Sequence, residues 1–195
     1  MNLSKVKIVA LDFDGVVTNL NIDWNHAIRL ASDMAGYDVK SILTFFEASE
    51  GKPIFKTVSR EIEKLELEAL KKAELTPFIT DFLQKISESH VEVYIVSMQS
   101  ARVVKKFLGD HGLTRFFKDV ITRERCPSKK AQVTCVLENS GVRAAEVLLV
   151  DDLARNISKC QKLGVKCFHF ARQQNSRKTR EMWNSIVDIV KGQVA

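Results

Sequence analysis

The chain of 195 residues is predicted to be an α/β protein in which a five-stranded, mainly parallel sheet is flanked by helices. Short apolar segments rich in β-branched residues alternate with amphipathic stretches, a pattern typical of buried parallel strands joined by helices. Such alternation favours an open sheet with right-handed crossovers. Ligands bind outside the carboxyl ends of the strands in these sheets, and polar residues stand where three of the expected strands end.

The expected core elements follow one another along the chain with short connections. Strands are expected at residues 6–11, 91–97, 119–122, 147–150 and 166–170. Amphipathic helices are expected at residues 77–89, 101–110, 128–139, 156–163 and 180–190. In the helix expected at 77–89, for example, Phe78, Phe82 and Ile86 fall on one face, which would pack against the sheet.

Residues 19–76 interrupt this alternation, because they contain no convincing strand. They have the pattern of three or four helices, roughly at 24–34, 39–49 and 54–73. This is too much chain for one crossover. The sequence therefore predicts a helical subdomain at 19–76, inserted into a core domain made of residues 1–18 and 77–195.

The composition restricts the functions that are expected. No apolar run approaches the roughly 20 residues of a membrane span, and the first residues lack the layout of a secretory signal, so a cytoplasmic protein is expected. The four cysteines match no C-x-x-C spacing, which favours reduced thiols. The net charge is +6, and part of the excess lies in residues 172–180. A solvated helix face is favoured there over a nucleic-acid tail, because aromatic interleaving and a binding motif are absent.

Two pairs of aspartates carry most of the functional information. Asp12 and Asp14 follow the first expected strand, and Asp151 and Asp152 follow the fourth. Carboxylates crowded at one site repel each other and raise each other's pKa. A hard cation compensates such charge, and Mg²⁺ bound by a few carboxylates together with a substrate phosphate is the usual case. The alternative is that these acids end strands or cap helices.

Four segments in this order resemble the motifs of the haloacid dehalogenase-like superfamily. They are DFDGVVT at 12–18, Ser97 after the apolar run 93–96, Lys129 or Lys130 ahead of a helix, and LLVDDLARN at 148–156. The resemblance covers residues 5–18 and 77–170. It implies a Rossmann-like core with the strand order 5-4-1-2-3, in which the first strand lies beside the fourth.

The resemblance also implies roles for the acidic residues. Asp12 would be the nucleophile that forms a covalent phospho-aspartate, and Mg²⁺ would be held by Asp12, Asp14 and Asp152. Because the second residue of the motif binds the metal through its backbone carbonyl, the side chain of Asp14 would be free as general acid and base. Asp151 would be a second or water-mediated partner, and Asn156 would orient a metal-bound water or the lysine, or open the next helix.

The phosphoryl oxygens would be held by Ser97, by nearby backbone N–H groups and by the motif III lysine. Lys129 fits that position better than Lys130. Counted from Lys129, the following apolar residues and a terminal glycine fall at the family's helix positions.

The helical insert resembles the type-1 cap of this superfamily, which closes over the site. The run Glu50-Gly51-Lys52-Pro53 resembles the turn by which such caps reach the substrate. Lys52 is therefore a candidate substrate contact, and the alternative is a surface lysine in a turn between helices.

The function expected from these motifs is that of a Mg²⁺-dependent phosphatase acting on a small phosphorylated metabolite, with no membrane or nucleic-acid partner. The resemblance is to the phosphoglycolate-phosphatase and β-phosphoglucomutase-like branch. A phosphomutase is the first alternative, since it would use the same residues. A non-catalytic binding or regulatory protein is the second, although Asp12, Asp14 and a motif lysine are all present.

Overall fold

The computed structural model describes residues 5–172 and 175–192, and its strands form one five-stranded sheet in the order β3-β2-β1-β4-β5. The strands are β1 (Ile8–Leu11), β2 (Glu92–Val96), β3 (Asp119–Ile121), β4 (Val147–Asp151) and β5 (Lys166–His169). Neighbouring strands all run parallel. The predicted fold class and strand order are therefore confirmed.

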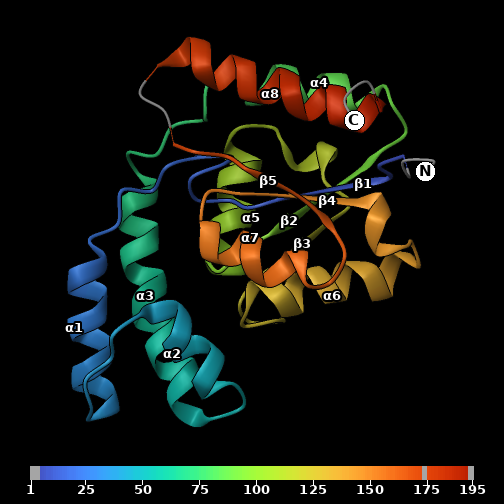
Figure 1. The fold of residues 1–195 in the computed structure, drawn as a ribbon. Helices are drawn as coiled ribbons and strands as arrows, with labels where there is room; N and C mark the ends of the chain where they lie inside the picture. Colours follow the sequence, from blue (N-terminus) through green and yellow to red (C-terminus); the bar gives the residue numbers. More distant parts are fainter. Residues whose placement is uncertain (1–4, 173–174, 193–195) are drawn as a thin grey trace.

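Helices cover both faces of the sheet (Figure 1). On one face lie α4 (Ile79–Ser87), α5 (Ala101–Asp110) and α8 (Ser176–Lys191), and on the other lie α6 (Lys129–Ser140) and α7 (Ala154–Gln161). Successive strand residues point to opposite faces, so Val9 and Leu11 pack with the first group, whereas Ile8 and Ala10 pack with the second. This explains why β1 is apolar at every position.

Helix α8 begins at Ser176, earlier than the start expected at residue 180. The side chain of Asn175 accepts a hydrogen bond from the backbone N–H of Arg177 at 2.9 Å and so caps the helix. The basic residues that follow form the exposed first turns of α8, as expected for a solvated helix face.

The pairing of β1 with β4 brings the two aspartate pairs together. Leu11 is opposite Val150, and the backbone N–H of Asp12 donates to the carbonyl of Val150 at 2.9 Å. Both strands end at this level, so Asp12 lies next to Asp151 at the carboxyl edge of the sheet. Two segments that are far apart in the sequence thus supply one site.

The insert after β1 consists of three helices, α1 (Trp24–Ala35), α2 (Ile42–Ser49) and α3 (Pro53–Leu70). They extend beyond the carboxyl ends of the strands, on the side away from the two termini (Figure 1). Asp23 and Ser41 cap α1 and α2 with their side chains, and Pro53 occupies the first turn of α3. The helices share an apolar cluster of their own, which also contains Met98 of the core.

A buried ion pair between Arg123 and Glu66 joins helix α3 to the core. Arg123 follows β3, is fully buried, and donates to Glu66, to the carbonyl of Met98 at 2.8 Å and to both oxygens of Ser59. The second carboxylate oxygen of Glu66 accepts the N–H of Ser100 at 3.1 Å. Burial raises the pKa of Glu66, against the opposing effect of Arg123. Both buried charges are therefore paired and hydrogen-bonded.

No helix within residues 5–172 and 175–192 is long and apolar enough to cross a membrane. The four cysteines are free thiols. Burial raises the pKa of Cys160 to about 12, which keeps this thiol protonated and unreactive at neutral pH.

Glu146 stabilises the start of β4 through charged partners. It ends the short 3₁₀ helix η2 (Ala144–Glu146) and accepts from the backbone and side chain of Arg143 at 2.9 and 3.0 Å, and it lies 3.0 Å from the amine of Lys7. The hydrogen bonds of Arg143, and then that of Lys7, lower the pKa of Glu146 to about 2. A lowered pKa means that the folded state holds this proton less tightly than the unfolded state.

The stability that Glu146 contributes should be present at neutral pH and lost as the pH falls from about 4.5 toward 2. We expect Glu146→Gln to lower the urea midpoint at pH 7, with a gap to the parent protein that narrows below pH 4.5. Circular dichroism of urea unfolding at a series of pH values measures this gap. Glu138→Gln, at an exposed position of α6, is the matched control. A gap that stays constant with pH would contradict the expectation.

Candidate active site

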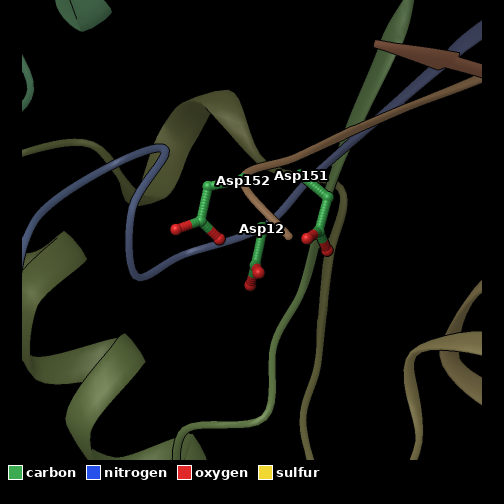
Figure 2. A group of neighbouring side chains, drawn as sticks. All are labelled: Asp12, Asp151 and Asp152. Carbon is green, nitrogen blue, oxygen red and sulfur yellow. The ribbon is translucent and has the colours of Figure 1, made fainter. Parts of the chain in front are cut away.

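Three carboxylates gather where β1 and β4 end (Figure 2). Asp12 follows β1, Asp151 ends β4, and Asp152 comes next. Each offers an oxygen, and these oxygens all lie within 4.8 Å of one another. Carboxylate oxygens at such spacing form a donor set that suits a hard divalent cation.

Lys129 lies buried against this cluster, at the start of α6. Its amine is 2.9 Å from an oxygen of Asp12 and 3.3 Å from an oxygen of Asp151, and it also donates to the carbonyl of Val96. Burial raises the pKa of Asp12 well above its usual range, opposed by Lys129 and reinforced by Asp151 and Asp152. Burial alone would lower the pKa of Lys129, but Asp12 and Asp151 raise it. The amine is therefore a charged group held next to Asp12.

The structure brings Lys129, and not its neighbour Lys130, to Asp12. Ser128 caps α6 by accepting from the N–H of Ala131 at 3.2 Å, which makes Lys129 the first helical residue. Lys130 is exposed and lines a separate pocket on the surface. The start of the helix therefore places Lys129, rather than Lys130, beside Asp12 and Asp151.

Asp14 lies beside the cluster rather than within it. One carboxylate oxygen accepts the N–H of Leu20 at 2.9 Å, and the other is 3.4 Å from Arg172. The chain between Asp14 and Leu20 turns sharply at Gly15, which has a φ of +89°. A Cβ on this residue would lie 2.2 Å from a carboxylate oxygen of Asp152, so only glycine fits.

The two acids after β4 have different surroundings. Asp151 is fully buried, and its oxygens accept from the N–H of Leu153 at 2.8 Å and from the side chain of Asn156 at 3.0 and 3.1 Å. Asp152 faces the site, and burial raises its pKa, opposed by Arg172. Asp152 is thus the better placed of the two to bind a cation, while Asn156 orients Asp151.

Arg172 also lies at this site, although the sequence indicated only that it belongs to the basic residues of 172–180. Its Nε atom is 2.7 Å from Asp152, its Nη2 atom is 3.4 Å from Asp14, and its Nη1 atom donates to Asn19 at 2.7 Å. Arg172 thereby ties the loop after β5 to the loop after β1. The signal that could have found it is its place, just beyond the carboxyl end of the last strand.

Ser97 follows β2 and is fully buried. Its hydroxyl donates to the side-chain oxygen of Gln99 at 2.6 Å and accepts the N–H of the same residue at 3.1 Å. Ser97 and Gln99 thus fix the loop after β2 through hydrogen bonds within the loop. The loop lies near Lys129, because the amine of Lys129 donates to the carbonyl of Val96. Gln99 is a second residue of this site that had not been expected.

A cavity of about 280 Å³ opens over Asp12, between the core and the helical insert. Its lining residues are Asp12, Asp14, Trp24, Ile28, Lys40, Ser41, Ile42, Leu43, Met98, Gln99, Asp152, Leu153, Asn156 and Arg172. Lys52 does not line it. This lysine is exposed, and its amine donates to the carbonyl of Ala48 at 2.9 Å. The structure therefore does not bring Lys52 to the cavity.

The site is an acidic centre at the carboxyl edge of an open parallel sheet. A buried lysine lies beside it and a helical insert lies above it. These features define an α/β enzyme of the hydrolase type. Residues 9–170 match the protein family described as haloacid dehalogenase-like hydrolase. The chain belongs to this family, and the membership predicted from the four motifs is confirmed.

Individual relatives agree with this assignment. The chain is 25% identical over 194 residues to the phosphoglycolate phosphatase of Aliivibrio fischeri, covering 85% of this chain and 83% of that protein. Its fold is similar to that of a predicted phosphatase from Clostridium acetobutylicum, with a TM-score of 0.69, 11% identity, and coverage of 95% and 100% of the two chains. A predicted phosphoglycolate phosphatase from Haemophilus somnus is also similar, with a TM-score of 0.64, 16% identity, and coverage of 99% and 100%.

Proposed function

We propose that the protein is a Mg²⁺-dependent phosphatase that hydrolyses a small phosphorylated metabolite through a phospho-aspartate on Asp12. The observation that carries the proposal is the position of Asp12, which lies 2.9 Å from a buried lysine and within 4.8 Å of two further carboxylates. The names of the curated relatives support the reaction class. The free cysteines agree with a cytoplasmic protein.

The donor set fits a magnesium ion. Burial raises the pKa of both Asp12 and Asp152, which disfavours their charged forms, and a bound divalent cation would favour those forms again. Asp12, Asp152 and the backbone carbonyl of Asp14 would hold the ion, with Asp151 behind them. When bound, magnesium would shield the carboxylates from the negative charge of the substrate phosphate.

In the first step, an oxygen of Asp12 attacks the phosphorus atom and the bond from phosphorus to the leaving oxygen breaks. Asp14 gives its proton to that oxygen, so the alcohol leaves uncharged. Lys129 and the N–H groups after Ser97 stabilise the charge on the phosphoryl oxygens. In the second step, Asp14 takes a proton from water, which attacks phosphorus and releases inorganic phosphate with Asp12 restored.

Residues 19–76 would act as the cap of this enzyme and residues 1–18 with 77–195 as its core. Helices α1 and α2 supply one wall of the cavity over Asp12. A wall of this kind excludes water from the reacting phosphate and contacts the part of the substrate that leaves.

A panel of phosphate monoesters tests the proposal. We expect release of inorganic phosphate with Mg²⁺ and none after the ion is removed with EDTA. A phosphomutase would instead convert a sugar phosphate into its isomer with little free phosphate. Absence of phosphate release from every ester in the presence of Mg²⁺ would overturn the proposal.

Asp14→Asn should slow esters of basic alcohols far more than esters of acidic phenols. A sugar or alkyl alkoxide needs the proton that Asp14 supplies, whereas 4-nitrophenolate needs it less. General acid–base help is worth about 10²–10⁴-fold, so initial rates on an alkyl phosphate and on 4-nitrophenyl phosphate should separate by a factor within this range. The variant should also accumulate phospho-enzyme from 4-nitrophenyl phosphate, because water is no longer activated. Equal losses on both esters, with no trapped intermediate, would leave Asp14 without this role.

A further inference from the structure

The cavity over Asp12 is polar at one end and apolar at the other. The polar end consists of the carboxylates, Gln99, Asn156 and Arg172, all of which belong to the core. The opposite wall has Trp24 and Ile28 from α1 and Ile42 and Leu43 from α2, with Lys40 and Ser41 at its edge just before α2. A phosphate bound at Asp12 would therefore direct its alcohol portion toward an apolar wall.

From this wall we infer the substrate class: a phosphate monoester whose alcohol portion is uncharged and largely apolar, and about the size of one ring. The inference rests on the proposed phosphatase function and gives that site its substrate. It differs from the substrate named for the curated relatives, since glycolate is a two-carbon acid that carries a negative charge.

Two cations, Lys40 and Arg172, line the cavity, and neither belongs to α1 or α2. Lys40 lies at the rim, where its side chain is 83% exposed and pairs with Asp38. Arg172 is at the polar end, bonded to Asp152 and Asn19. Among the described lining residues, the wall formed by α1 and α2 thus offers no cation to a second anionic group. A carboxylate pressed against it would lose water without gaining a partner, which is costly.

Two core side chains extend the apolar surface toward the acids. Met98 lies in the loop after β2, and Leu153 follows Asp152 directly. Leu153 is 37% exposed, and Leu153 and Tyr37 are the exposed large apolar residues of the described chain. An apolar group bound beside Leu153 would cover this surface. The apolar lining therefore continues from the cap down to the reacting centre.

The volume sets the size of the alcohol portion. An apolar cavity of about 150 Å³ in another protein holds one benzene molecule. The cavity here, of about 280 Å³, has room for a ring of that size as well as a phosphoryl group. A two-carbon alcohol would leave most of the apolar wall without contact.

Two esters that differ by one charge test the inference. Benzyl phosphate and 4-carboxybenzyl phosphate have the same ring and the same type of leaving oxygen. We expect kcat/KM of the wild-type protein to be at least about 10-fold higher for benzyl phosphate, the scale on which small changes in an apolar pocket act. Phosphoglycolate should also be at least about 10-fold poorer. Equal values, or a preference for either carboxylate ester, would overturn the inference while leaving the phosphatase function intact.

A charge placed on the wall should weaken the preference for the uncharged ester. Leu43→Lys adds a cation inside the cavity, and Thr44→Lys adds the same charge at the next, exposed position of α2, outside the lining. We expect the ratio of kcat/KM between benzyl and 4-carboxybenzyl phosphate to fall at least about 10-fold in the first variant and to stay unchanged in the second. Equal ratios in both variants, with both folded by circular dichroism, would contradict the proposed wall.

A binding measurement separates this inference from the proposed reaction. Benzylphosphonate cannot be hydrolysed, and Trp24 lines the cavity whereas Trp183, the other tryptophan, is buried elsewhere. We expect benzylphosphonate to change tryptophan fluorescence with at least about 10-fold higher affinity than phosphonoacetate, in wild type and in Asp12→Asn. Tighter binding of phosphonoacetate would overturn the substrate class, and no hydrolysis of any ester despite binding would overturn the reaction.

Discussion

Replacement of Asp12 by asparagine will abolish phosphate release and leave the fold intact. Asparagine keeps the shape of the side chain but cannot attack phosphorus, and loss of a nucleophile in other hydrolases lowers kcat by on the order of 10⁶-fold. Stability without metal should hold or rise, because burial raises the pKa of Asp12 and so penalises its charged form in the folded protein.

Phosphate release with Mg²⁺ measures the loss of activity, and thermal unfolding in EDTA measures the stability without metal. Asp33→Asn makes the same chemical change at an exposed position of α1 and should alter neither quantity. Near-normal Mg²⁺-dependent release by Asp12→Asn would exclude Asp12 as the nucleophile.

The largest loss of stability is expected for Arg123→Met, at about 3–5 kcal/mol. The side chains of Arg123 and Glu66 are 0% and 1% exposed, so removal of the arginine leaves a buried carboxylate without its partner. It also leaves the carbonyl of Met98 without the hydrogen bond that Arg123 donates. Urea unfolding measures the change.

The double variant Arg123→Met with Glu66→Met should recover much of this loss, because it removes both buried charges together. Recovery should be incomplete, since Ser59 and Ser100 also lose partners. Lys106→Met, which breaks an exposed ion pair on α5, should cost no more than about 1 kcal/mol. If Arg123→Met costs no more than Lys106→Met, the buried pair does not stabilise the joint between α3 and the core.

The sheet and the acidic centre could be predicted from the sequence because their signals are local. Each strand is a short apolar run, and the aspartates stand directly after two of these runs. Once the strand order follows from the motifs, the carboxyl ends of β1 and β4 must lie side by side. Asp12 and Asp152 then meet without any detailed knowledge of side-chain packing.

Contacts between distant elements could not be predicted in this way. Arg172 reaches Asn19 across 153 positions of the chain, and Arg123 reaches Glu66 across 57. In each case the residue type is common on protein surfaces, and only the packing of the elements decides that it meets a partner. Lys52 is the converse case: its motif resembles a substrate-binding turn, whereas its amine donates to the carbonyl of Ala48 in the preceding helix α2.

Among the described residues, three ion pairs join the helical insert to the core, and they differ in exposure; the third, between Arg102 of α5 and Glu63 of α3, also holds α3. Arg123 and Glu66 are buried under α3, whereas Lys159 of α7 and Glu47 of α2 are 43% and 30% exposed and lie 2.8 Å apart. An exposed pair is worth about 0–1 kcal/mol and is screened by salt, so it breaks readily. The path by which a substrate reaches Asp12 should therefore open between α2 and α7, with α3 as the fixed axis, and should open more often as ionic strength rises.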